Sequence, residues 1–207
     1  MAKQWAFYFD SSQCSGCKTC QIACKDKQDH AVGLRWRNVY EVAGGHWEAK
    51  GDSNWESGIE SYNISMSCNH CEDPICMKNC PNGAIYKNEE GIVLIDADRC
   101  MGCKYCQWAC PYGALHLNKQ TGKMTKCDLC IDYLAEGKQP SCVAACPMRV
   151  LKVGELSELR SEFDDWENIY PLPSAHITKP SLVIKAKEAA KKEMNWKIIN
   201  REEVRDA

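Results

Sequence analysis

The segment Cys14-Ser-Gly-Cys17-Lys-Thr-Cys20-Gln-Ile-Ala-Cys24 decides how the rest of the sequence is interpreted. Its four cysteines follow the spacing C-x2-C-x2-C-x3-C. The same spacing returns 86 residues later, from Cys100 to Cys110, and Gly16 and Gly102 occupy equivalent positions in the two copies. Glycine at such a position allows the backbone to approach a bound group closely. The repeat indicates the duplication of one small module.

Working outward from this segment, all 16 cysteines of the 207-residue chain fall into four groups of four. Group II widens one gap to x4 and group IV widens it to x11, and a proline follows the last cysteine of groups II, III and IV. The groups are Cys14, Cys17, Cys20 and Cys24 (I); Cys68, Cys71, Cys76 and Cys80 (II); Cys100, Cys103, Cys106 and Cys110 (III); and Cys127, Cys130, Cys142 and Cys146 (IV). The spacing of groups I and III is the bacterial ferredoxin signature for [4Fe–4S] clusters.

The spacing has a physical reason. Three thiolates two residues apart can surround one face of a cubane from a single loop. The fourth lies a helical turn further on, faces away, and ligates the other cluster of a pair. The following proline ends the short helix. The sequence therefore predicts four [4Fe–4S] clusters in two modules of two.

The strand pattern predicts which groups pair. After Cys80, a strand, a turn at Asn88–Gly91 and a second strand at Ile92–Ile95 lead directly into group III. Trp5–Phe9 and Val150–Val153 have no neighbouring partner, so we expect them to pair and to bring group IV beside group I. The ligand sets are then set A (Cys14, Cys17, Cys20, Cys146), set B (Cys24, Cys127, Cys130, Cys142), set C (Cys68, Cys71, Cys76, Cys110) and set D (Cys80, Cys100, Cys103, Cys106).

Other uses of so many cysteines fit less well. Four tetrahedral zinc sites would also consume them, and group IV alone resembles a zinc ribbon, but structural zinc prefers two separated C-x2-C knuckles. A disulfide scaffold suits a shorter secreted chain, and thioredoxin-like chemistry needs one exposed pair. With four complete tetrads no histidine is needed as a ligand. The histidines, interpreted as ordinary, are His30, His46, His70, His116 and His176.

Composition excludes further classes. A formal net charge of −2 argues against nucleic-acid binding, which rests on phosphate neutralisation. The sequence has no run of 18 apolar residues and shows no export signal, so we expect no membrane span of its own. Basic residues in or next to the motifs would offset cluster charge and raise reduction potentials, or belong to a solvated face. They are Lys18, Lys25, Lys78, Arg99, Lys104, Lys126 and Arg149.

The fold class expected is α+β, with two ferredoxin-like modules, an inserted hairpin region and an extended C-terminal arm. The first module comprises residues 1–33 and 123–154, the insertion 34–66, the second module 67–122 and the arm 155–207. A hairpin is expected to turn at Gly44-Gly45, with Ile59–Met66 as another strand; Trp36, Trp47 and Trp55 either pack on the modules or form an interaction face. In the arm we expect helices at Glu155–Phe163 and Leu182–Asn195, little core, and folding against a partner.

Several segments together resemble the iron–sulfur electron-transfer subunits of the dimethyl sulfoxide reductase family, from about residue 4 to about 185. They are the group I loop, Tyr40-Glu-Val-Ala-Gly-Gly-His-Trp47, Ser67-Cys-Asn-His-Cys-Glu-Asp-Pro74, Met124-Thr-Lys-Cys-Asp128 and Pro171-Leu-Pro-Ser-Ala-His-Ile-Thr-Lys-Pro180. In the related nitrate reductase subunit, tryptophan at the second position of group III leaves a [3Fe–4S] cluster. Here that residue is Cys103, so the resemblance implies a cubane.

The resemblance also implies partners: a molybdopterin catalytic subunit beside set A and a quinol-oxidising membrane anchor beside set D, with no substrate site on this chain. The chain would then be membrane-associated through its partners, either remaining cytoplasmic or crossing the membrane folded with a twin-arginine partner. The same role in a formate dehydrogenase, a polysulfide or thiosulfate reductase, or a soluble complex stays open, as does a zinc-stabilised interaction module.

Overall fold

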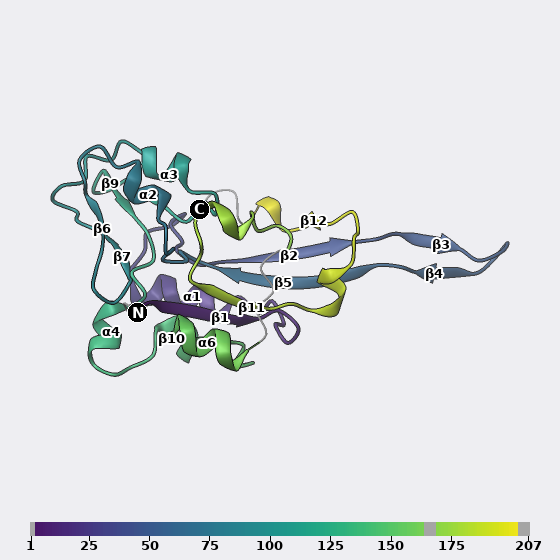
Figure 1. The fold of residues 1–207 in the computed structure, drawn as a ribbon. Helices are drawn as coiled ribbons and strands as arrows, with labels where there is room; N and C mark the ends of the chain where they lie inside the picture. Colours follow the sequence, from purple (N-terminus) through teal and green to yellow (C-terminus); the bar gives the residue numbers. More distant parts are fainter. Residues whose placement is uncertain (1–2, 164–168, 203–207) are drawn as a thin grey trace.

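The computed structural model describes residues 3–163 and 169–202 and has the expected α+β class: short helices lie among several small sheets, and one long hairpin extends from the body (Figure 1). The helices are α1 (Thr19–Lys27), α2 (Ile75–Lys78), α3 (Tyr105–Ala109), α4 (Ile131–Ala135), α5 (Ser141–Ala144), α6 (Leu156–Glu162) and the 3-10 turns η1 (Ala175–Ile177) and η2 (Glu188–Lys191). The strands are β1 (Trp5–Asp10), β2 (Asn38–Gly44), β3 (Trp47–Ala49), β4 (Trp55–Ser57), β5 (Glu60–Met66), β6 (Ile85–Lys87), β7 (Val93–Ile95), β8 (His116–Asn118), β9 (Lys123–Thr125), β10 (Leu151–Glu155), β11 (Leu182–Lys185) and β12 (Lys197–Ile198).

Strand β1 lies at the centre of a three-stranded sheet of order β10-β1-β11. Its aromatic residues favour extended backbone, and five of its six residues are buried. Phe7 faces Val153 of antiparallel β10 on one side and Leu182 of parallel β11 on the other. The predicted pairing of the first strand with the strand after group IV is therefore confirmed.

The inserted region differs from the expected hairpin. Strand β2 pairs with β5 over seven residues, from Asn38 opposite Met66 to Gly44 opposite Glu60. The prediction of a turn at Gly44-Gly45 is wrong, because the two strands continue together beyond this point as β3 and β4. Gly45 has a φ of +90°, and a Cβ there would lie 2.1 Å from the Gly58 carbonyl oxygen. The two glycines thus lie within one long hairpin instead of closing it.

The tip of this hairpin, formed by β3 and β4, points away from the rest of the molecule (Figure 1). All six residues of β3 and β4 are exposed, and the side chains of Trp47 and Trp55 are 54% and 66% exposed. Trp36 instead packs against the main core, and its Nε1 donates a hydrogen bond to Thr125 Oγ1 at 3.1 Å. Of the three tryptophans named from the sequence, only Trp36 therefore packs on the cysteine-bearing modules. Trp47 and Trp55 do not, which leaves the alternative of an interaction face for these two.

Two short hairpins with the same turn chemistry follow groups II and III. Asn88 Oδ1 accepts hydrogen bonds from the backbone N–H groups of Glu90 and Ile92 in the β6–β7 turn. Asn118 Oδ1 accepts from Gln120 in the β8–β9 turn. An asparagine that satisfies the backbone two residues ahead favours a tight turn. This similarity extends the repeat seen in the cysteine motifs.

The C-terminal segment also differs from expectation. The helix at Glu155–Phe163 is confirmed as α6, but Leu182–Asn195 forms β11, η2 and irregular chain instead of a helix. The branched side chains of Val183 and Ile184 suit a strand beside β1, and tertiary pairing overrides the helix-forming composition that follows. Residues 164–168 and 203–207 of the expected arm lie outside the described part.

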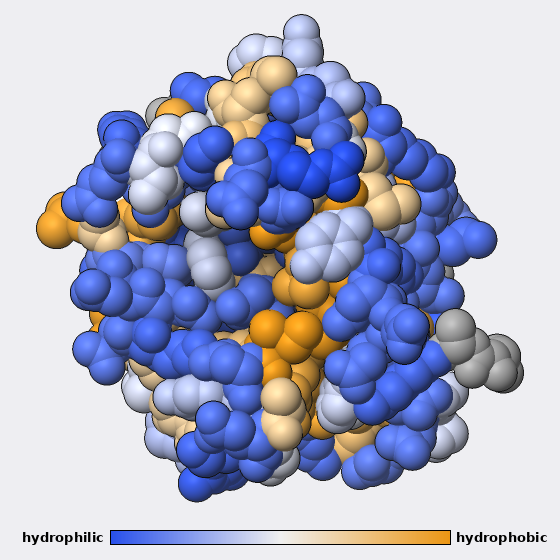
Figure 2. All heavy atoms as spheres, turned by 90° about the vertical axis from the view of Figure 1, so that its left-hand side faces the viewer, coloured by the Kyte–Doolittle hydropathy of each residue, from blue (hydrophilic) through white to orange (hydrophobic). Residues whose placement is uncertain are grey.

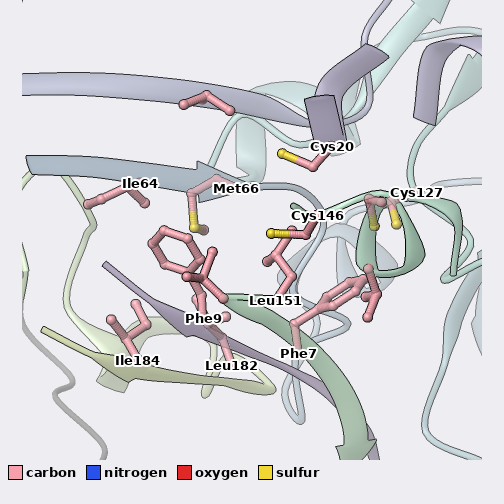
Figure 3. Packing of buried hydrophobic residues seen from close by; sticks show 14 of the residues in the cluster. Phe7, Phe9, Cys20, Ile64, Met66, Cys127, Cys146, Leu151, Leu182 and Ile184 are labelled. Atoms are coloured by element: carbon pink, nitrogen blue, oxygen red, sulfur yellow. The ribbon is translucent and has the colours of Figure 1, made fainter. Parts of the chain in front are cut away.

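The main core includes both the expected apolar strands and the cysteines. Phe7, Phe9, Leu151, Leu182 and Ile184 pack together, with the sulfurs of Cys20 and Cys146 above them (Figure 3). The end of the molecule opposite the β3–β4 tip carries a band of apolar residues flanked by hydrophilic ones (Figure 2). Among the described residues, none of the helices has the length and apolar character needed to cross a bilayer.

Candidate metal centres

The two copies of the repeated motif have the same backbone shape. Gly16 and Gly102 have φ values of +71° and +72°, and Lys18 and Lys104, two residues later, have +62° and +65°. Helices α1 and α3 begin immediately afterwards. Each loop therefore winds in the left-handed region before its helix. A Cβ at Gly102 would lie 2.1 Å from the Gly122 carbonyl oxygen, so neighbouring chain as well as backbone conformation requires glycine there.

The helices that carry the cysteines pack in pairs. Helix α1 of group I contacts α5 of group IV, and α2 of group II contacts α3 of group III. Within the described residues, no three Cys, His, Asp or Glu side chains are arranged to hold a single metal ion. The thiols instead surround larger spaces.

Two of these spaces are cavities that each contain one complete ligand set. Set D lines the first cavity, and apolar side chains such as Ile85, Ile95 and Met124 complete its wall. Set C lines the second cavity, whose wall is completed by residues that include Val93, Leu115 and Thr178. Four thiols around an apolar cavity are the donor set that a [4Fe–4S] cubane requires. The residues present therefore fit the cluster.

The thiols of sets A and B are also electrostatic neighbours. Cys14 is influenced by Cys17, Cys20 and Cys146, which are the other members of set A. Cys24 is influenced by Cys142 and Cys130, and Cys127 by Cys24. Thiols of groups I and IV are therefore neighbours, as the predicted exchange of one cysteine in each direction requires.

Comparison with known proteins places the sequence in a family. The model of the 4Fe-4S dicluster domain family matches residues 59–156. The B subunit of anaerobic dimethyl sulfoxide reductase from Escherichia coli is 51% identical over 185 residues, covering 89% of this chain and 90% of that protein. The chain belongs to the family of anaerobic dimethyl sulfoxide reductase B subunits. The B subunit from Haemophilus influenzae is 46% identical, over 91% of this chain and 92% of that protein.

A more distant relative indicates the shared role. The thiosulfate reductase electron transfer subunit of Salmonella typhi is 37% identical, over 80% of this chain and 82% of that protein. Together with the dicluster domain, this identifies the present family member as an iron–sulfur electron-transfer subunit. The expected family, fold class and [4Fe–4S] cofactor are therefore confirmed.

Burial controls the acidity of the thiols in this family member. Desolvation raises the pKa of Cys14 to about 11 and those of Cys24, Cys71 and Cys76 to about 12. Cys17 is exposed, and a hydrogen bond from Thr19 lowers its pKa. Since a cluster binds thiolates, its insertion must release protons from the buried cysteines.

Hydrogen-bond donors already point at several sulfurs. The backbone N–H of Ala84 donates to Cys80 Sγ at 3.2 Å, and that of Met124 to Cys100 Sγ at 3.4 Å. Cys20 Sγ lies 3.2 Å from the Ser65 hydroxyl oxygen. Such donors stabilise negative charge on sulfur and tune the potential of a bound cluster.

Among the basic residues named from the sequence, Lys126 is buried, and its ammonium donates to the carbonyl oxygens of Val93 and Cys127. Lys18 and Lys25 are half-buried, whereas Lys78, Arg99, Lys104 and Arg149 are exposed. The sequence-based interpretation is thus divided: one lysine lies inside the fold, and the solvated-face alternative fits the four exposed side chains.

Sequence reasoning missed two buried polar residues near the thiols, Thr178 and Arg37, and interpreted a third, His70, as ordinary. Thr178 of the tail lines the set C cavity and hydrogen-bonds Cys71. His70 is fully buried; its Nδ1 accepts the Val93 N–H at 3.1 Å, and burial lowers its pKa well below the usual value. Arg37 is 2% exposed. Only adjacency to Cys71 could have signalled His70, and nothing local signals Arg37.

Proposed function

We propose that this chain holds four [4Fe–4S] clusters, one on each of sets A, B, C and D. The observation that supports the proposal is that sets C and D each line one cavity, while thiols assigned to sets A and B influence one another electrostatically. Such clusters accept and release single electrons, while the protein determines their potential and spacing. Each set takes three cysteines from one group and the fourth from its paired group.

We propose further that the sets form one row in the order A, B, C, D. Contacts between neighbouring sets support this order. Cys20 of set A influences Cys142 of set B, and Cys68 of set C influences Cys127 of set B. Cysteines of sets C and D share one apolar cluster. A row of this kind suits a chain that relays electrons from one end to the other.

The partners proposed are a molybdopterin catalytic subunit beside set A and a quinol-oxidising membrane anchor beside set D. The names of the relatives support a reductase complex, and the loop and helix at set D support an interface. There Met101, Tyr105 and Trp108 are 59%, 55% and 72% exposed. Exposed apolar residues gathered beside a redox site favour contact with a partner. Membrane association would then depend on the anchor.

A second candidate keeps the electron-transfer role in another complex. The relatives include a thiosulfate reductase subunit and the iron–sulfur subunit of an Escherichia coli formate dehydrogenase, which is 36% identical over 72% of this chain. The greater identity to the B subunits of anaerobic dimethyl sulfoxide reductase favours that type of complex. Identification of the large subunit that co-purifies with this chain separates the two.

The cluster count is tested by iron and sulfide analysis of the anaerobically purified complex. Four cubanes predict about sixteen irons and sixteen sulfides on this chain, after subtraction of any on the partner. Spin quantitation by electron paramagnetic resonance during reductive titration should give four one-electron centres. About eight irons in fully occupied protein would contradict the proposal, and a colourless zinc protein would exclude it.

A further inference from the structure

Arg37 is an arginine enclosed by the fold between the cysteine groups. It precedes β2, and its side chain is the largest of the fully buried ones in the described part of the chain. Nη1 donates to Ser65 Oγ at 3.1 Å, and Nη2 donates to Ser67 Oγ at 2.9 Å. The guanidinium carbon lies 4.7 Å from the centre of the Phe7 ring. These contacts fix the position of the positive charge.

The surroundings of this charge contain no acidic counter-ion. Within residues 3–163 and 169–202, no carboxylate forms an ion pair with Arg37, and both serines are neutral. An unpaired buried charge costs several kcal/mol in order of magnitude, so proteins retain one only where something compensates it. The largest electrostatic influences on Arg37 come from cysteine sulfurs.

Four cysteines from sets A and B exert the largest attractive electrostatic effects on the guanidinium of Arg37. Burial acts to lower the pKa of Arg37, but negative charge at these sulfurs more than offsets it. The cysteines are Cys142, Cys20, Cys127 and Cys24. The Ser65 hydroxyl that accepts from Arg37 Nη1 lies 3.2 Å from Cys20 Sγ, so one serine connects the guanidinium to a set A sulfur. The cation therefore faces the boundary between set A and set B.

We propose that Arg37 is a positioning residue for electron transfer: its buried charge serves as the shared counter-ion of the set A and set B clusters and raises their reduction potentials. The proposal rests on the ligand sets given above. A reduced cluster is more negative than an oxidised one, so a fixed nearby cation stabilises the reduced state. Low local dielectric makes this interaction strong. The Asp128 carboxylate also acts on Cys24 and Cys127, but among the described residues it forms no ion pair with Arg37.

Lys18 provides a matched contrast in the same region. It lies between Cys17 and Cys20, but it is partly open to water, and its ammonium pairs with Glu41 at 2.9 Å. A cation that is partly open to water and already paired contributes little net field. Its removal should therefore change the cluster potentials much less than removal of Arg37, although both substitutions delete one positive charge.

The experiment is an anaerobic redox titration of the assembled complex, followed by electron paramagnetic resonance, for Arg37→Gln, Arg37→Lys and Lys18→Gln. We expect Arg37→Gln to lower the midpoint of at least one centre so that its reduced-to-oxidised ratio at fixed potential falls about tenfold or more, which is about 59 mV for one electron. Arg37→Lys should stay close to the parent value, and Lys18→Gln should change the ratio less than about threefold.

Cluster content is measured first, by iron analysis, so that failure of the four-cluster assignment in the parent protein is distinguishable from failure of the Arg37 proposal. Loss of clusters in Arg37→Gln with retention in Arg37→Lys would support the charge requirement. A midpoint in Arg37→Gln equal to that of Lys18→Gln would overturn it. Loss of clusters in both Arg37 variants would also overturn it, because shape rather than charge would then be decisive.

Discussion

The C-terminal strand β11 should stabilise the cysteine-bearing body, and the substitution Val183→Ala tests this. Val183 lies in β11 opposite Tyr8, is fully buried, and packs with Ala6, Leu156 and Leu159. The substitution removes two methyl groups, worth about 1.6 kcal/mol of transfer free energy, and the residual cavity brings the cost to about 2 kcal/mol. For a chain of this size, each kcal/mol lowers the Tm by roughly 2–4 °C, so the expected decrease is about 4–8 °C.

The assay follows loss of visible absorption on anaerobic heating at a fixed scan rate, because cluster loss makes unfolding irreversible. Val32 offers a matched control, since it is 100% exposed and Val32→Ala removes the same atoms. That variant should unfold within about 2 °C of the parent, because surface substitutions change stability by less than about 0.5 kcal/mol. Equal Tm decreases in the two variants would refute the view that β11 is part of the core.

Three further predictions follow from the same structure. Truncation after Phe163 should abolish stable cluster retention by the isolated chain, because it removes the buried residues Ile169, Val183 and Ile184. Each contributes about 1.5–3 kcal/mol, against a total free energy of unfolding of about 5–15 kcal/mol. Iron analysis checks this, and an undiminished iron content would contradict it. Cys103→Ser should convert the set D cluster to a [3Fe–4S] centre of higher potential, visible as a new signal in the oxidised protein, while the adjacent Lys104→Gln should not; absence of the signal in an assembled variant would show that Cys103 is not a ligand. Replacement of residues 46–57 by a two-residue Asn-Gly turn should leave iron content and Tm unchanged, because β3 and β4 are exposed along their length. Cluster loss in this variant would show that the β3–β4 tip stabilises the rest of the molecule.

The parts of the fold that the sequence could predict are those governed by local chemistry. Cysteine spacing, the glycines at 16 and 102 and the Asn-led turns each leave a short-range signature, and the two glycine loops recur in the structure with nearly identical backbone angles. The pairing of β1 with β10 was also predictable, because an aromatic strand without a neighbour needs a partner.

The parts that could not be predicted depend on contacts between distant segments. Gly44-Gly45 has the composition of a turn, but seven residue pairs between β2 and β5 carry both strands past it. The lysine- and alanine-rich stretch that begins at Leu182 has helical propensity, but its first residues, Leu182–Lys185, form strand β11 because they pair with the free edge of β1. Arg37 has no motif around it, and its importance appears only when four cysteines from two distant groups surround it.

The central position of β1 has a consequence for the order of biosynthesis. The first strand to leave the ribosome finds its sheet partners only at residues 151–155 and 182–185. Sets C and D, by contrast, lie wholly between Cys68 and Cys110. Non-local pairing is slow because loop closure must precede it, and domains form in the order in which they are completed. The cysteines proposed for sets C and D are therefore all made well before the sheet around β1 can form, although the wall of the set C cavity is completed only by Thr178.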